Sequence, residues 1–263
     1  MRPPPGSKDR RARTSMPYVK ALTPKTDKPL YDLVRKDRDT WQAFLAFIDD
    51  KQQSRWVFRG CASLGHRFIP SVGRDARTYQ LTDEIRVFKA FQKSAGLYLQ
   101  TLPATEWDWL ALAQHYGLPT RLLDWTTNPL VAAYFAVSSE PLDEAAVVYA
   151  HMVSDREVLD TSIASDPYAI GDVSFMLPDR SVRRIVSQRG LFSVHPQPNI
   201  AWEPSDLVAN QFVIEPELRL RFRTRLSTLG VDDTHIYADL AGLCQTLRWR
   251  YANRLGIGSM LIG

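Results

Sequence analysis

The chain has 263 residues, of which 44% are hydrophobic and 24% charged, a composition typical of a globular protein that can bury a sizeable core. No apolar run approaches the roughly 20 residues that cross a bilayer, and the N-terminal residues lack the apolar stretch of a secretory signal. We therefore expect no membrane insertion. The formal net charge is +4, but residues 1–28 hold much of the positive charge and the remainder is slightly negative.

Residues 1–28 are basic and rich in proline, which predicts a disordered tail followed by a single globular domain over residues 29–263. Such a tail is either simply solvated or contacts nucleic acid or anionic lipid weakly and non-specifically through its charge. Cys61 and Cys244 are too few for a disulfide framework or a zinc site, and the histidines are scattered, so we expect no metal. Cys61 is expected to be a small buried thiol, and a cytoplasmic location is expected.

The first half of the chain carries clear element signals. Apolar spacing from Asp39/Thr40 to Ile48 predicts a helix, and alternation over residues 54–60 predicts a strand that ends at a glycine. A cap at Thr82, a capping box over residues 105–108 and the Asn128–Pro129 pair predict three further helices. The last of these helices is apolar nearly all round, so we expect it to be buried.

The second half mixes strands and helices. Residues 145–152 predict a buried strand, and residues 154–180 a long loop or insertion. Residues 184–188 and 190–195 predict one strand with a kink near Gly190, and residues 211–214 a further strand. The spacing of Ile236, Leu240, Leu243 and Leu247 predicts one C-terminal helix. Without regular βαβ alternation, this order indicates an α+β fold.

Residues 113–129 form the most informative segment. Ten side chains that can form hydrogen bonds lie in one short connection between two predicted helices, which is typical of a binding or catalytic site. Arg59 at the end of the first strand, beside Gly60, could hold a phosphate or carboxylate. Gly60 would let a ligand approach the backbone closely.

Each of these residues also has a purely structural interpretation. Arg59 could pair with Asp124, His115 could satisfy carbonyls at a helix end, and Tyr116 could pack in the core. Arg121 and Asp124 could pair and brace the segment. Thr126 could bind an anion at the following helix N-terminus or simply cap that helix.

The sequence resembles the FRG-domain family, named for its Phe-Arg-Gly motif. The matching residues cover roughly 40–245. They are Trp56–Gly60, Pro70–Arg74, Glu84 with Phe88 and Phe91, Gln114–Thr126 with Asn128–Pro129, Ala132–Ala136, Arg184–Phe192 and Leu226–Leu240. The order of these blocks is in turn similar to that of ADP-ribosyltransferases.

That second resemblance implies a split mixed or antiparallel sheet with flanking helices, and NAD as the substrate. Arg59 would hold NAD, and residues 124–126 would form a strand leading into the helix at 132–136. Gln188 would stand where such enzymes place a catalytic Glu. Because Gln cannot act as a general base, Asp124 becomes the expected catalytic carboxylate, with Glu215 and Glu217 as alternatives. Gln188 would contact nicotinamide or ribose.

The implied NAD-binding residues are Arg59, Gly60, His115, Tyr116, Arg121, Trp125 and Thr126, with Tyr116 and Trp125 as walls for the nicotinamide ring. The expected function is mono-ADP-ribosyl transfer to an unknown protein or nucleic-acid acceptor, by family habit in a toxin or phage-defence effector. The alternative is a non-catalytic module that binds a nucleotide or ADP-ribose.

Overall fold

The computed structural model describes residues 28–178 and 183–256. The predicted tail, apart from Lys28, lies outside the described residues. The chain divides into two compact units between Asp39 and Thr40, and helix α1 (Lys28–Asp49) runs through this division. All the other elements belong to the second unit.

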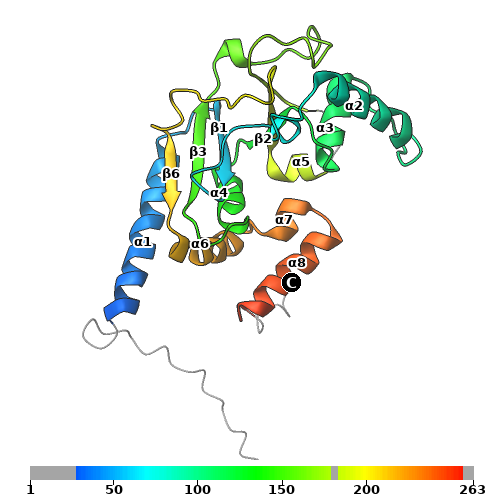
Figure 1. The fold of residues 1–263 in the computed structure, drawn as a ribbon. Coiled ribbons are helices and arrows are strands. Elements are labelled where there is room, and N and C mark those ends of the chain that lie inside the picture. Colours follow the sequence, from blue (N-terminus) through cyan, green and yellow to red (C-terminus); the bar gives the residue numbers. More distant parts are fainter. Residues whose placement is uncertain (1–27, 179–182, 257–263) are drawn as a thin grey trace, which may run out of the picture. The chain divides into compact units, whose positions relative to one another are not determined.

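The second unit is built on a six-stranded sheet with the order β4-β5-β2-β1-β3-β6 (Figure 1). All five pairings of neighbouring strands are antiparallel. The strands are β1 (Trp56–Cys61), β2 (Leu122–Thr126), β3 (Ala146–Met152), β4 (Ser174–Met176), β5 (Gly190–Val194) and β6 (Gln211–Ile214). The predicted α+β class is confirmed, and the sheet is antiparallel rather than mixed.

The sheet is split in its middle. Strands β1 and β2 are in register at a single pair, Phe58 with Thr126. In contrast, β1 pairs with β3 through six residues and β2 pairs with β5 through five. A β-ladder holds neighbouring strands at a fixed spacing only where it continues. The two three-stranded halves of the sheet therefore part beyond this pair.

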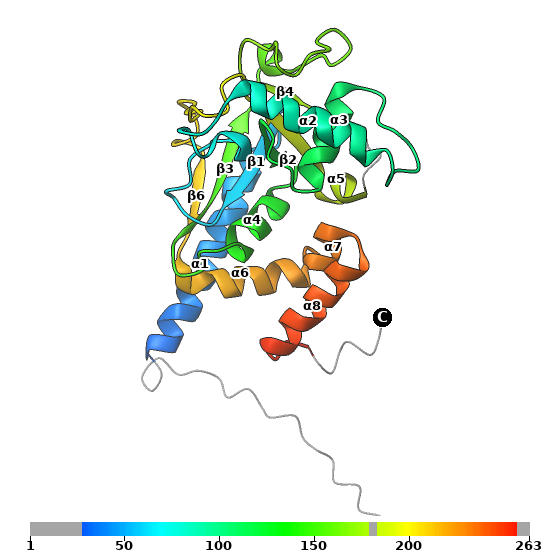
Figure 2. The same ribbon diagram turned by 45° about the vertical axis from the view of Figure 1, so that its right-hand side comes forward.

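One face of the sheet carries helix α4 (Pro129–Ser138), which packs on β1 and β3 and also contacts α6 (Pro216–Thr228) (Figure 2). The close approach depends on Gly60. A Cβ on this residue would overlap the carbonyl oxygen of Ala132 and stand 2.7 Å from the Ala136 nitrogen. The predicted burial of α4 is confirmed, since most of its residues are buried.

An aromatic cluster covers the other face. Phe68, from the segment after β1, stacks on Trp125 with ring centroids 5.9 Å apart. Phe175 and Trp202 pack edge-on against the same indole. The Trp125 Nε1 donates a hydrogen bond to Ser193 Oγ at 2.9 Å, so its polar atom is satisfied within the core.

Helices α2 (Leu81–Ala95) and α3 (Glu106–His115) lie beside β2, and three short elements complete this part of the fold. These are the 3₁₀ turns Ser71–Gly73 and Asp155–Glu157 and helix α5 (Arg183–Gln188). Helices α7 (Asp233–Tyr237) and α8 (Leu240–Ala252) pack on each other. Within the described residues, no helix is long and apolar enough to span a bilayer.

Several local predictions are confirmed. The strand at 54–60 is β1, and the strands predicted at 145–152 and 211–214 are β3 and β6. The capping box of Thr105 and Asp108 starts α3, and the Asn128 side chain accepts from the Leu130 N–H at the start of α4. Cys61 is buried, as expected, and Cys244 is exposed.

Other predictions are wrong. Helix α1 begins at Lys28 rather than at Asp39/Thr40, and α2 is capped at Gln80, with Thr82 inside its first turn. The connection at 113–129 is not only a loop, since it contains β2 (Leu122–Thr126), which includes the strand that the second resemblance implies at residues 124–126.

Two further predictions fail where the backbone turns left-handed. Residues 184–188 belong to α5 instead of continuing β5, and Arg189 separates the two with φ +48°. The predicted single C-terminal helix is broken into α7 and α8 at Ala238, whose φ is +52°. Residues with positive φ cannot continue a right-handed helix or an extended strand.

Candidate functional site

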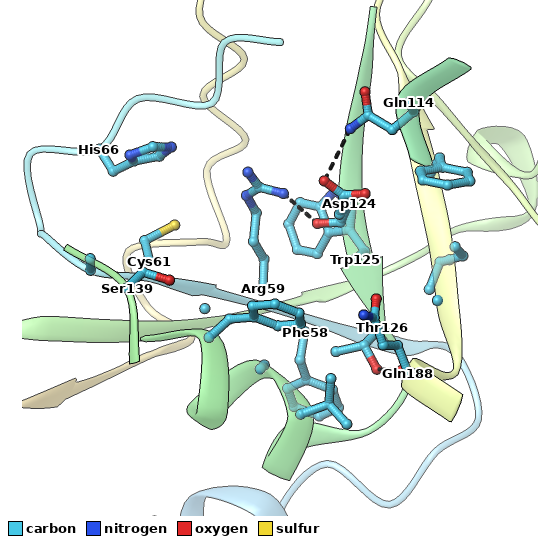
Figure 3. Close-up of a pocket in the computed structure, with 18 of the residues that line it drawn as sticks. Phe58, Arg59, Cys61, His66, Gln114, Asp124, Trp125, Thr126, Ser139 and Gln188 are labelled. Carbon is cyan, nitrogen blue, oxygen red and sulfur yellow. Dashed lines mark hydrogen bonds between the residues drawn. The ribbon is translucent and has the colours of Figure 1, made fainter. Parts of the chain in front are cut away.

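A cavity of about 330 Å³ opens where β1 and β2 part (Figure 3). This volume lies at the lower end of the range for small-molecule sites. Four consecutive residues of β1, Phe58–Cys61, and the following Ala62 line it, together with Asp124–Thr126 of β2 and one side of α4. The remaining lining residues come from the segments around His66, Arg74, Gln114, Ser139 and Gln188.

Arg59 bridges the split. One Nη1 hydrogen is donated to the main-chain carbonyl of Asp124 on β2, and the Arg59 Nε is buried with no partner among the described residues. The expected alternatives were anion binding and a pair with the Asp124 carboxylate. The structure joins Arg59 to the Asp124 main-chain carbonyl instead, and Arg59 lines the cavity.

The Asp124 carboxylate is held by a separate chain of hydrogen bonds (Figure 3). The Gln114 Nε2 of α3 donates to Asp124 Oδ2 at 3.1 Å, and the Gln114 Oε1 accepts from Thr120 Oγ1 at 2.6 Å. The Thr120 N–H in turn donates to Ser71 Oγ at 3.1 Å. These bonds orient an exposed carboxylate toward the cavity.

The wall opposite Asp124 is positive. Burial, together with the charges of Arg59 and Arg74, lowers the pKa of His66, so its imidazole is neutral at pH 7. Burial raises the pKa of the Cys61 thiol, and the nearby Arg59 charge opposes this shift only in part. The fixed cations on this side are therefore Arg59 and Arg74, which could hold an anion.

Thr126 and Gln188 line the cavity but also hold the structure together. The Thr126 Oγ1 donates to the Gln188 carbonyl at 2.6 Å and accepts from the Asn128 N–H at 2.9 Å. The Gln188 Nε2 donates to the Ile236 carbonyl at 3.0 Å, which ties the end of α5 to α7. One amide hydrogen of Gln188 is thus used by the fold.

Two residues implied as NAD-binding do not line the cavity. Tyr116 is 69% exposed, and its ring packs edge-on against His115, which does line the cavity. Arg121 is 0% exposed and forms a two-pronged ion pair with Glu84, at 2.8 and 2.7 Å. The suggested Arg121–Asp124 pair is therefore wrong, because Arg121 points into the core behind β2.

Two other residues implied as NAD-binding, Trp125 and Gly60, border the cavity but have structural roles. Trp125 borders the cavity, but its ring belongs to the aromatic cluster on the face of the sheet opposite α4. Gly60 also borders the cavity, yet the place of its missing Cβ is taken by α4, so the helix rather than a ligand requires glycine here.

Sequence reasoning missed several lining residues. The α4 wall is formed by Val131, Ala132 and Phe135, and its continuation brings in Ser139 and Glu140. Phe135 follows Val131 and Ala132 by four and three residues, so the three share one face of the helix. This spacing would have predicted all three as lining residues once one of them was known to border the site. Neither Glu215 nor Glu217 lines the cavity, since both lie at the start of α6.

Among the described residues, no group of three or more His, Cys, Asp or Glu side chains is placed to hold a metal ion. The model of the FRG domain family matches residues 54–145, from just before β1 to just before β3. This match supports the FRG-domain resemblance over that range. No curated protein and no solved structure matches the chain.

Proposed function

We propose that the cavity between β1 and β2 binds NAD and cleaves the bond between nicotinamide and ribose, as an ADP-ribosyltransferase or NAD glycohydrolase does. One observation carries the proposal. The split in the sheet brings a guanidinium from β1 and a carboxylate from β2 into one cavity of about 330 Å³.

The cavity has positive groups for the diphosphate of NAD and a negative group for the ribose, on which positive charge develops. Arg59 and Arg74 would hold the diphosphate through charge-assisted hydrogen bonds. Phe58, Phe135 and Phe192 offer apolar and aromatic surface for a flat ring. These side chains replace Tyr116 and Trp125, whose rings lie elsewhere.

Asp124 would stabilise the transition state. As the bond from ribose C1′ to the nicotinamide nitrogen breaks, its electron pair leaves with nicotinamide and positive charge develops on the ribose. A carboxylate held in place by Gln114 interacts more favourably with this charge than with the ground state. An acceptor oxygen or nitrogen, or water, then bonds to C1′ and gives up a proton.

A second candidate is a binding module that holds NAD or ADP-ribose without cleaving it. It is favoured by Gln188, which by the resemblance would stand where such enzymes place Glu, and whose amide donates to the Ile236 carbonyl. The acceptor, whether protein, nucleic acid or water, is a separate question under the first candidate.

Binding and turnover separate the two candidates. Purified protein is titrated with NAD in a calorimeter and assayed for nicotinamide release, beside Arg59→Ala and Asp124→Asn. The matched controls are Arg77→Ala and Asp172→Asn, which alter exposed residues that do not line the cavity. If the protein is an enzyme, we expect Arg59→Ala to bind NAD more weakly. We expect Asp124→Asn to retain NAD binding but to release nicotinamide about 100-fold more slowly, or slower still. Tight binding without release indicates the binding module.

A further inference from the structure

The cavity has a second carboxylate, Glu140, that the resemblance does not assign. It lies two residues beyond the end of α4 and lines the same cavity as Asp124. Ser139, its neighbour, lies beside Cys61 on the side of Arg59 away from Asp124 (Figure 3). Both carboxylate-bearing residues, Asp124 and Glu140, therefore line one cavity.

The segment that carries Glu140 is fixed by one buried side chain. Arg219 of α6 is 3% exposed, and its guanidinium donates only to main-chain carbonyls. The acceptors are those of Ala62 at 3.1 Å, Ala136 at 2.9 Å and Glu144 at 3.0 Å, with Ser139 and Pro141 in addition.

This arrangement ties the end of β1, the end of α4 and the following turn to one rigid group. Such a cage is costly to build, because a buried guanidinium has to replace all its water hydrogen bonds. Its consequence for the site is that the backbone at residues 139–141 cannot drift away from the cavity mouth. The Glu140 Oε2 also accepts from the Leu142 N–H at 3.1 Å, which limits the side chain as well.

We infer that Glu140 is the general base of the site, placed to take the proton of the nucleophile that attacks ribose C1′. This inference rests on the proposed NAD cleavage. In glycoside hydrolysis by inversion, one carboxylate on the face opposite the leaving group activates water. Nicotinamide leaves as a neutral group and needs no general acid. The reaction therefore needs only a general base for the nucleophile and a carboxylate that stabilises the charge on the ribose.

The step balances as follows. The C1′–N bond breaks and its electron pair neutralises the nicotinamide ring. The nucleophile forms its bond to C1′, and its proton passes to a Glu140 carboxylate oxygen. Asp124 takes no proton in this step and acts only on the charge that develops on the ribose.

The test compares Glu140→Gln with Glu144→Gln in the full chain. Glu144 is exposed, lies four residues away and does not line the cavity, so the same chemical change there is a matched control. NAD affinity is measured by calorimetry, and kcat for nicotinamide release is measured from pH 4.5 to 8. We expect Glu140→Gln to bind NAD as the unaltered protein does, and its kcat to fall about 100-fold. Glu144→Gln should keep the kcat of the unaltered protein across this pH range.

The other outcomes each overturn something specific. Unaltered kcat in Glu140→Gln removes Glu140 from the reaction and leaves the proposed function in place. Loss of NAD affinity in Glu140→Gln makes Glu140 a binding group and overturns its role as base. Absence of nicotinamide release by the unaltered protein overturns both this inference and the proposed enzyme.

Discussion

Replacing Arg121 with methionine is expected to destabilise the fold rather than to remove a ligand contact. The Arg121 guanidinium and the Glu84 carboxylate are 0% and 3% exposed and share two hydrogen bonds, at 2.8 and 2.7 Å. The guanidinium also lies 4.4 Å from the centre of the Tyr168 ring, and the Tyr79 hydroxyl donates to Glu84 at 2.8 Å. Burial and the Glu84 carboxylate raise the pKa of Tyr79 to about 12, so this hydroxyl stays protonated.

Arg121→Met leaves the Glu84 charge buried without its partner. Removing one member of a buried ion pair costs about 3–5 kcal/mol, which lowers the melting temperature of a domain of this size by about 10 °C. Removing both charges in Arg121→Met/Glu84→Leu eliminates the unpaired carboxylate. The double variant should therefore lie within about 2 kcal/mol of the unaltered protein.

Urea unfolding at pH 7 measures Arg121→Met, Glu84→Leu and the double variant, and the double-mutant cycle gives the coupling between the two residues. NAD affinity is measured in parallel below the unfolding transition. The structural assignment would be refuted if Arg121→Met unfolded at the same urea concentration as the unaltered protein while its NAD binding was lost. That result would return Arg121 to the ligand site.

Three further predictions concern stability. Gly60→Ala should cost about 3 kcal/mol or more, because its Cβ would meet the backbone of α4, whereas Gly65→Ala, with 3.5 Å to its nearest neighbour, should change stability little in the same urea titration. Asn128→Ala should cost about 1 kcal/mol through loss of the cap of α4, and an unchanged urea midpoint would contradict this. Burial, with Arg59 and Arg121, lowers the pKa of His195 to about 3. The unfolded chain then binds the extra proton first, so stability should fall as pH decreases from 6.5, by up to about 1.4 kcal/mol per pH unit. His195→Gln should flatten this slope, and an identical slope in both proteins would rule out the assigned cause.

Local signals in the sequence located the elements next to the site. The Thr105–Asp108 capping box and the Asn128–Pro129 start depend on residues within one turn, so adjacent positions suffice to predict them. The alternation that predicts β1 is likewise local. Local signals did not predict β2, so the proximity of Arg59 and Asp124 follows only from the observed pairing of β1 with β2.

The predictions fail where the local structure depends on residues far apart in the sequence or on unusual backbone torsions. Arg121 and Glu84 are 37 positions apart, and nothing beside either residue reveals the pair. Ala238 takes a left-handed conformation that is uncommon for alanine, so the break between α7 and α8 carries no residue signature. Glu140 lines the cavity from a turn whose backbone is bonded to Arg219, a residue of a different helix about 80 positions away.

Release of labelled nicotinamide from NAD by the purified chain tests the proposed function most directly. The proposal predicts release by the unaltered protein, reduced about 100-fold or more in Asp124→Asn and unchanged in the Asp172→Asn control. Release that is equal in Asp124→Asn and in the unaltered protein would contradict the role of Asp124. No release by a folded protein, with or without cell extract as a source of acceptors, would contradict NAD cleavage at this cavity.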